Sequence, residues 1–359
     1  MNELYNNAKI FHFRDKLASL ATGRLTSPIH IRLKPTNRCN HRCGYCCYRN
    51  KSLFLSELMH ERDEIPHEKM EEIIADLGRM GVKAVTFSGG GEPLCYPHIV
   101  ESIRGLLAQR VKVALLTNGA LLAGDVAELL AEHGAWVRVS MDAADPESYA
   151  RARGVGPREF ARVCENVRRF AGTPARKCVL GLNLIVTREN SGSVRAFLEQ
   201  AKDMGADHVK VSGAVVSTRP DENTAYLAPF FEAVKQQIRE AAARLSDARF
   251  SVVDKFHMPV SALEAYERAY TRCPFAQCLA VIAADQNVYT CQDKAYTRSG
   301  LLGSIRTCSF RELWNSERLH RRLFALDPSR ECRHHCVAHA KNLALLDYME
   351  ADAEHLDFV

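Results

Sequence analysis

Between residues 29 and 213, short apolar runs rich in β-branched residues alternate with longer stretches whose apolar residues recur every three or four positions. The short runs predict buried strands and the longer stretches predict amphipathic helices. The predicted strands are Ile29–Lys34, Ala84–Ser88, Val111–Thr117, Trp136–Met141, Val179–Val186 and His208–Ser212. The predicted helices are Pro66–Met80, His98–Gln109, Asp125–Glu132, Arg158–Phe170 and Ser193–Met204. This part of the chain is therefore predicted to be a regular succession of strand–helix units.

Strict alternation of strands and helices favours an α/β fold with a parallel sheet and helices on its outer face. Gly81, Gly134 and Gly205 each stand where a helix would end before the next strand. Six right-handed units would curve into a partial (β/α)6 TIM-like barrel, in which active sites gather at the C-terminal ends of the strands.

The character of the chain changes after this region. A helix is predicted over Ala228–Leu245, and a hairpin is predicted from Cys278–Ala284 and Asn287–Thr290 around Asp285–Gln286. The predicted organisation is an N-terminal extension (1–28), the partial barrel (29–213), a helical connector (214–249) and a cysteine-rich C-terminal domain with its tail (250–359).

Composition narrows the classes of protein. A hydrophobic fraction of 47% and a charged fraction of 25% are typical of a globular protein. The net charge of +5 is spread along the chain without a Lys/Arg block, so no nucleic-acid partner is predicted. No apolar stretch suits a membrane span or a signal peptide, which favours a cytoplasmic protein without a membrane partner. In a reducing compartment, thirteen cysteines indicate metal binding rather than disulfides.

Three cysteines follow the first predicted strand, in Cys39-Asn-His-Arg-Cys43-Gly-Tyr-Cys46. Three thiolates on one loop can bind three corners of a cubane cluster and leave the fourth iron without a protein ligand. The alternatives are a zinc loop in which His41 serves as a further ligand, or a chance grouping of thiols.

A second set lies near the C-terminus and consists of Cys273, Cys291, Cys332 and Cys336. Two thiols around a hairpin and two from a later turn can ligate a whole cubane with no iron left open. The alternative is a structural zinc site.

The first motif, with Tyr45 before its third cysteine, resembles the signature of the radical S-adenosylmethionine (SAM) superfamily. The resemblance implies a 4Fe-4S cluster held by Cys39, Cys43 and Cys46, with SAM chelating the open iron. It also implies reductive cleavage of SAM to a 5′-deoxyadenosyl radical, driven by an external one-electron reductant such as flavodoxin or ferredoxin.

The same resemblance implies a SAM site along the strand ends. The segment Ser88-Gly-Gly-Gly-Glu-Pro93 is similar to the family's GGEP segment, which contacts the methionine amino group of SAM. The implied cofactor-binding residues are Tyr45, Ser88, Gly89, Gly90, Gly91, Glu92, Pro93, Asn118, Ser140, Asp142, Arg153 and Asn183. The alternatives are structural: a tight turn at the glycines, a left-handed turn at Asn118, and helix capping by Ser140 or Asp142.

The C-terminal cysteines resemble the SPASM/twitch subgroup of this superfamily, in its form with a single auxiliary 4Fe-4S cluster. Asp285-Gln-Asn-Val-Tyr-Thr-Cys291 is similar to the subgroup's turn motif, with Gln286 where glycine is usual. Six cysteines lie beyond residue 270, fewer than a full SPASM domain uses for two clusters. Of these, Cys278 alternates with apolar neighbours, which favours a core position or a substitute ligand, and Cys308 is also open as a ligand. Cys278 and Cys308 are the candidates for donating a hydrogen atom to a substrate radical; the catalytic residues are otherwise unassigned.

The resemblance implies an oxidoreductase that abstracts a substrate hydrogen and passes the remaining electron to the auxiliary cluster. The segment before the first strand, residues 1–28, is too short for the leader-binding domain that peptide-modifying members of the subgroup usually carry. This favours dehydrogenation of a small polar, carbohydrate-like or nucleoside-like substrate. The positive net charge of the protein would suit a phosphate or carboxylate group on that substrate. The alternatives are an epimerase of a sugar or peptide, a maturase of a ribosomal peptide, a methyl- or adenosyl-transferring enzyme, and a non-enzymatic metal-binding module.

Overall fold

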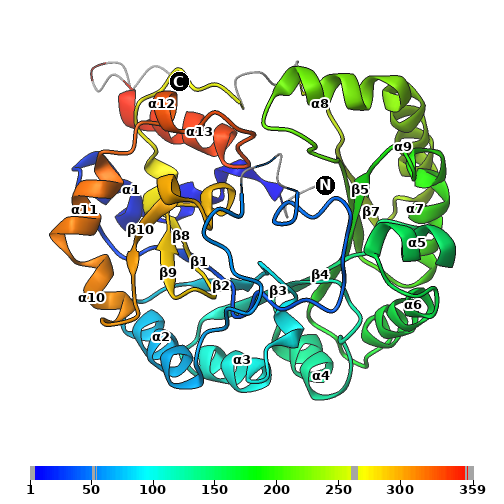
Figure 1. Ribbon diagram of the computed structural model, residues 1–359, viewed down its shortest axis with the longest axis horizontal. Helices are drawn as coiled ribbons and strands as arrows, with labels where there is room; N and C mark the ends of the chain where they lie inside the picture. Colours follow the sequence, from blue (N-terminus) through cyan, green and yellow to red (C-terminus); the bar gives the residue numbers. More distant parts are fainter. Residues whose placement is uncertain (1–4, 51–52, 54, 260–265, 352–353, 355–359) are drawn as a thin grey trace.

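A ten-stranded sheet organises the computed structural model, which describes residues 5–50, 53, 55–259, 266–351 and 354. The strand order is β10-β9-β8-β1-β2-β3-β4-β5-β6-β7. Figure 1 shows the strands curving into an arc with helices around its outside. The predicted partial barrel is therefore confirmed.

The six predicted strands all form and pair in parallel. They are β1 (His30–Leu33), β2 (Ala84–Phe87), β3 (Lys112–Thr117), β4 (Trp136–Ser140), β5 (Val179–Val186) and β6 (His208–Gly213). A further strand, β7 (Ser251–Lys255), pairs in parallel with β6. The barrel sheet therefore continues beyond residue 249, where the sequence predicts a new domain; the domain limits themselves stay a prediction.

Apart from the start of α9, the outer helices match the predicted ones to within two residues at each end. They are α2 (His67–Arg79), α3 (Ile99–Ala108), α4 (Gly124–His133), α6 (Arg158–Ala171), α7 (Val194–Asp203) and α9 (Phe231–Leu245), and Figure 1 shows them outside the arc; for α9 alone, the predicted start at Ala228 belongs instead to a short 3-10 turn, Ala228–Phe230. Gly81 and Gly205 follow their helices with left-handed φ values of 71° and 83°. Two further helices are α5 (Pro146–Arg153) and α8 (Pro220–Leu227).

Alternation along the strands separates two faces of the sheet. Fully buried residues that join the core shared with the helices are Ile31 and Leu33 of β1, Val137 and Val139 of β4, and Val209 and Val211 of β6. The residues between them therefore face the concave side, where β1 contributes Arg32, β4 contributes Arg138 and β6 contributes Lys210.

The predicted hairpin is also confirmed. Strands β8 (Leu279–Ile282) and β9 (Asn287–Tyr289) are antiparallel, and β9 also pairs with β10 (Leu301–Ser304). Gln286 lies in the turn with a φ of 59°, a left-handed conformation that costs a side-chain-bearing residue about 1–2 kcal/mol. This explains why glycine suits the position. Strand β8 pairs in parallel with β1, so the C-terminal region and the barrel share one sheet.

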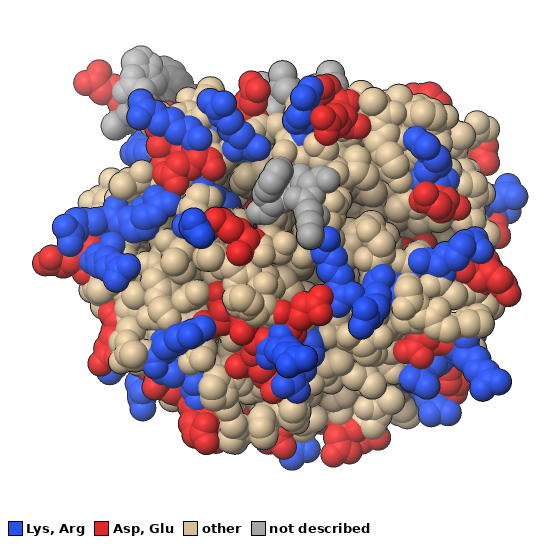
Figure 2. All heavy atoms as spheres, viewed as in Figure 1, with Lys and Arg blue, Asp and Glu red and all other residues tan. Residues whose placement is uncertain are grey.

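Short helices complete the C-terminal region. They are α10 (Phe310–Trp314), α11 (Glu317–Phe324), α12 (Pro328–Glu331) and α13 (His339–Glu350). The N-terminal 3-10 helix Asn7–His12 contacts α13, and α1 (Arg14–Ala21) follows it. Among the described helices, none has the length and apolar character needed to cross a bilayer. Figure 2 shows Lys/Arg and Asp/Glu side chains interspersed on the face in view.

Candidate active site

The loop that carries Cys39, Cys43 and Cys46 leaves the C-terminal end of β1 and rests on the end of α5. The Arg42 amide donates to the Arg153 carbonyl oxygen (2.8 Å), and the Gly44 amide donates to that of Ala152 (3.3 Å). Gly154 ends α5 with a φ of 61°, and a Cβ there would lie 2.5 Å from the Arg42 carbonyl oxygen. Glycine at this position therefore lets the cysteine loop approach the helix.

Arg153 joins this loop to the end of β4. Its guanidinium donates to the Cys43 Sγ (3.3 Å) and lies 3.1 Å from the Asp142 carboxylate. Asp142 also accepts hydrogen bonds from the Tyr45 hydroxyl (2.5 Å) and the Ile185 amide (2.6 Å). Three of the predicted cofactor-binding residues, the half-buried Tyr45 and the buried Asp142 and Arg153, thus form one network beside a predicted cluster ligand.

Replacing Arg153 by glutamine is expected to lower the free energy of unfolding by about 3 kcal/mol, because the buried Asp142 carboxylate loses its ion-pair partner. Thermal unfolding of the reconstituted protein measures this, and its iron content reports on the contact with Cys43. Arg158→Gln, at an exposed position on α6, is the matched control and should change stability by no more than about 0.5 kcal/mol. Equal unfolding temperatures for the two variants would contradict the expectation.

The glycine segment pairs with the start of the cysteine loop. The Gly91 amide donates to the Thr36 carbonyl oxygen (3.2 Å), and the Glu92 amide donates to that of Arg38 (2.8 Å). A Cβ on Gly91 would lie 2.0 Å from the Arg38 carbonyl oxygen. On Gly90 it would lie 2.1 Å from the Asn37 Oδ1. The glycines therefore permit a close backbone approach that a side chain would block.

Replacing Gly91 by alanine is expected to displace the cysteine loop and destabilise the protein by about 1–3 kcal/mol. Less iron should bind on reconstitution, because Cys39 follows directly after the displaced Arg38. Gly156→Ala is the control, since a Cβ there meets nothing within 4 Å. The measurement is iron per chain, and full loading of Gly91→Ala would show that the close approach is not needed.

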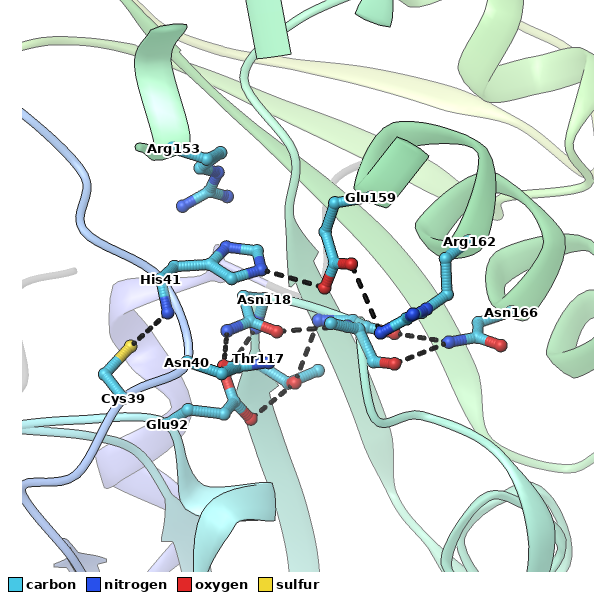
Figure 3. Close-up of polar contacts among 12 residues, drawn as sticks. Cys39, Asn40, His41, Glu92, Thr117, Asn118, Arg153, Glu159, Arg162 and Asn166 are labelled. Carbon is cyan, nitrogen blue, oxygen red and sulfur yellow. Dashed lines mark hydrogen bonds and ion pairs between the residues drawn. The ribbon is translucent and has the colours of Figure 1, made fainter. Parts of the chain in front are cut away.

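The Glu92 side chain turns into the fold. Its carboxylate accepts hydrogen bonds from the Thr117 hydroxyl (2.6 Å), the Asn118 amide (2.7 Å) and the Leu94 amide (3.1 Å). Burial raises the pKa of this carboxyl, although the three hydrogen bonds oppose the shift. Figure 3 shows Glu92 beside Thr117 and Asn118, with the Asn118 side chain in contact with Asn40. Glu92 therefore ties the ends of β2 and β3 together.

Other predicted cofactor-binding residues differ in whether their side chains form hydrogen bonds within the protein. The Asn118 side chain donates to the Asn40 Oδ1 (2.7 Å) and accepts from the Ala120 amide (3.0 Å). The buried Ser88 hydroxyl has no partner among the described residues. Ser140 and Asn183 are neighbours in the sheet, and the described residues give their side chains no hydrogen bond. Polar side chains at strand ends that have no hydrogen-bond partner among the described residues suit a polar cofactor such as SAM.

A cavity of about 390 Å³ adjoins this network at the ends of β4, β5 and β6. Its lining includes Tyr45 and Asp142 together with Asn50, Thr187 and Asn190. The last three were not predicted from the sequence, because no local motif marks them. The side-chain amide of Asn190 donates to the backbone carbonyl oxygen of Asp142 (2.9 Å), which holds the turn after β4 in place. The size and the mixed lining suit a ligand as large as SAM.

His41 is placed differently from what a zinc loop would need. Its buried ring lies with Nε2 3.5 Å from the Glu159 carboxylate and edge-on to Tyr149. Figure 3 shows the ring directed towards Glu159 while the Cys39 side chain lies on the other side of the backbone. Among the described residues, no three Cys, His, Asp or Glu side chains are gathered to hold a single metal ion. In a cubane each thiolate binds a different iron, so its sulfur atoms stand further apart than around one ion.

The four C-terminal cysteines line one cavity. Cys273, Cys291, Cys332 and Cys336 all line one small cavity of about 30 Å³. Burial raises the pKa of each of these thiols. Metal binding would therefore have to displace their protons. Four thiols around one space fit a cluster whose irons are all bound by the protein.

Side chains from distant parts of the chain support this cavity. The side-chain amide of Asn342, on α13, donates to the Cys273 Sγ (3.4 Å). The buried Arg268 guanidinium donates to the carbonyl oxygens of His334 (2.7 Å) and Cys332. Such contacts around a metal ligand orient it and tune the metal. No signal in the sequence marks Asn342 or Arg268, because their partners lie more than sixty residues away.

The two remaining cysteines of this region lie elsewhere. Cys278 is buried in a small core with Ile10, Leu17 and Leu345, and Cys308 donates to the Ser304 carbonyl oxygen (3.4 Å). Neither lines the two cavities described above. A role of either thiol in hydrogen donation stays a prediction.

Comparison with known proteins agrees with this arrangement. A model of the radical SAM superfamily matches residues 33–201, and a model of the SPASM iron–sulfur cluster-binding domain matches residues 273–337. The AdoMet-dependent heme synthase of Methanosarcina barkeri is 26% identical over 83% of this chain and 85% of its own length. The PqqA peptide cyclase of Streptomyces rochei is 26% identical over 63% of this chain and 60% of its own.

The fold is also found in a solved structure. Streptococcus suis SuiB bound to its precursor peptide SuiA superposes with a TM-score of 0.62 at 17% identity, over 91% of this chain and 76% of that chain. At this identity the likeness shows the fold alone. With two family models matching the two cysteine-bearing regions, the chain belongs to the radical SAM superfamily, and its cofactors are SAM, the 4Fe-4S cluster of that superfamily and an auxiliary iron–sulfur cluster of the SPASM type.

Proposed function

We propose that this radical SAM enzyme is an oxidoreductase that dehydrogenates a small polar substrate. Cys39, Cys43 and Cys46 hold the SAM-binding cluster, and Cys273, Cys291, Cys332 and Cys336 hold one auxiliary cluster. SAM and the two clusters together supply a hydrogen-abstracting radical and an acceptor for the electron that the substrate retains.

The observation that carries the proposal is the shared cavity of the four C-terminal cysteines. Four thiolates leave no iron open for SAM or substrate, so the second cluster is suited to electron transfer rather than to ligand binding. Dehydrogenation needs such an acceptor: one hydrogen atom leaves by abstraction, a proton leaves to a base, and one electron remains to be taken up.

The residues of the chain contribute positioning. Tyr45 and Asp142 hold the wall of the 390 Å³ cavity beside the cysteine loop, and Arg153 fixes Asp142 relative to Cys43. These three side chains, joined by hydrogen bonds and an ion pair, link the wall of the cavity to the first cluster loop.

The test is product analysis under anaerobic conditions. Reconstituted protein, reduced flavodoxin and SAM are incubated with small carbohydrates and nucleoside sugars, and 5′-deoxyadenosine and substrate mass are followed. A product lighter by two hydrogen atoms supports dehydrogenation. A product of unchanged mass supports epimerisation, and methyl or adenosyl incorporation would rule out the oxidoreductase.

Peptide maturation is the second candidate. The observation favouring it is the similarity to the PqqA peptide cyclase of Streptomyces rochei. Incubation with precursor peptides encoded beside the gene separates the two candidates, because a small-molecule dehydrogenase would leave every such peptide unmodified.

A further inference from the structure

Three cationic side chains lie on the concave face of the barrel. Arg32 of β1, Arg138 of β4 and Lys210 of β6 each stand between two residues that pack against the outer helices. Lys210 pairs in register with Asn183, which is in turn beside Ser140. The cationic cluster, defined as Arg32, Arg138 and Lys210, therefore lies just below the strand ends that carry the predicted SAM site.

These three side chains form no ion pair with the residues that the structure describes. In the same part of the chain, Arg32 and Lys210 make no hydrogen bond through their side chains. Arg138 donates to the Tyr5 hydroxyl (3.1 Å). Two other enclosed cations have carboxylate partners, in the pairs Arg153–Asp142 and Arg176–Asp207. The buried Lys34 and Arg268 are held instead by hydroxyl and carbonyl oxygens.

The members of the cluster are close enough to affect one another. Burial, followed by the positive charges of Arg138, Arg32 and Lys255, lowers the pKa of Lys210 to about 7. Burial and the charge of Arg138 lower the pKa of Arg32 to about 10, against the opposing effect of Tyr48 and Asp293.

One surrounding group adds to the positive charge. Lys341 is close enough to Arg32 for the guanidinium charge, after burial, to lower the pKa of Lys341. The nearby carboxylate, Asp293, accepts a hydrogen bond from the Val337 amide (3.0 Å). Asp293 acts on Arg32 but is not among the groups that shift the pKa of Lys210, so these partly buried positive charges still repel one another. A bound anion would relieve that repulsion.

We propose that the cationic cluster binds an anionic group of the substrate, a phosphate or a carboxylate. Two guanidinium groups and an ammonium group converge on the same face, which suits an oxyanion that accepts several charge-assisted hydrogen bonds. None of the three lines the cavity of Tyr45 and Asp142, so the anion site is separate from that cavity. This inference rests on the proposed function for the identity of the bound molecule as substrate.

The test is isothermal titration calorimetry of the reconstituted protein, loaded with SAM, against inorganic phosphate, succinate and glycerol. The unaltered protein is expected to bind phosphate or succinate and to give no heat of binding with glycerol. The anion that binds more tightly identifies whether the substrate group is a phosphate or a carboxylate. Arg32→Gln combined with Lys210→Gln should raise the Kd by at least about tenfold. Arg168→Gln, an exposed charge on α6, should leave the Kd unchanged.

Iron content and thermal unfolding of each variant show whether it has folded. Failure of the unaltered protein to bind either anion would overturn the inference, as would equal affinity in the double variant. A double variant that weakens SAM binding instead would assign the cluster to SAM and overturn it too. The proposed function fails separately, if the unaltered protein forms no 5′-deoxyadenosine with SAM and reductant.

Discussion

Replacing Cys39, Cys43 and Cys46 together by alanine is expected to lower the iron content from about eight to about four atoms per chain and to abolish 5′-deoxyadenosine formation. The three cysteines lie on the loop held by Gly91 and Arg153, and the remaining iron would belong to the C-terminal cysteines. Iron and sulfide analysis after anaerobic reconstitution measures the first effect, and chromatography of the SAM products measures the second.

Cys47→Ala provides the matched control, because this thiol is adjacent to Cys46 but outside the motif. It should keep about eight irons and full SAM cleavage. If the triple variant instead keeps all its iron, or if the unaltered protein binds zinc after reconstitution, the assignment of these three ligands is wrong.

Replacing Cys332 and Cys336 by alanine is expected to separate the two halves of the reaction. The cavity loses two of its four thiols, so about four irons should be lost, while the cluster bound by the N-terminal loop stays. SAM should still be cleaved, but the oxidised product should disappear because the electron acceptor is gone. Product yield per 5′-deoxyadenosine formed is the measurement.

The control for this variant is Cys278→Ala with Cys308→Ala, two thiols of the same region that do not line the cavity. Both the iron content and the ratio of product to 5′-deoxyadenosine should stay at the level of the unaltered protein. A full yield of oxidised product from the Cys332/Cys336 variant would show that the auxiliary cluster is not the electron acceptor.

The barrel strands could be predicted because each is a local apolar run. The Val179–Val186 run, for example, becomes β5 without any change of boundary. The strand β7 was missed, since Ser251–Lys255 offers only Val252 and Val253 before two charged residues, and its strand conformation depends on pairing with β6. Helix α5 was missed although Asp145 caps it and Pro146 begins it, because its apolar stripe is too weak to give a clear period.

The site divides in the same way between local and distant contacts. The cysteine loop and the glycine segment are short motifs, and the sequence identifies their residues directly. The partners that give those motifs their geometry come from far along the chain, as with Arg153 on Cys43 and Asn342 on Cys273. Contacts over such separations leave no spacing pattern in a single sequence.

The parallel pairing of β1 with β8 has a consequence for synthesis. Domains generally fold from the N-terminus as the chain is made. However, the edge of β1 that receives β8 stays open until residues 279–282 have left the ribosome. An unpaired edge strand invites pairing with other chains. Shortened chains that end before β8 are therefore expected to aggregate, even though they would contain all of the first cysteine motif.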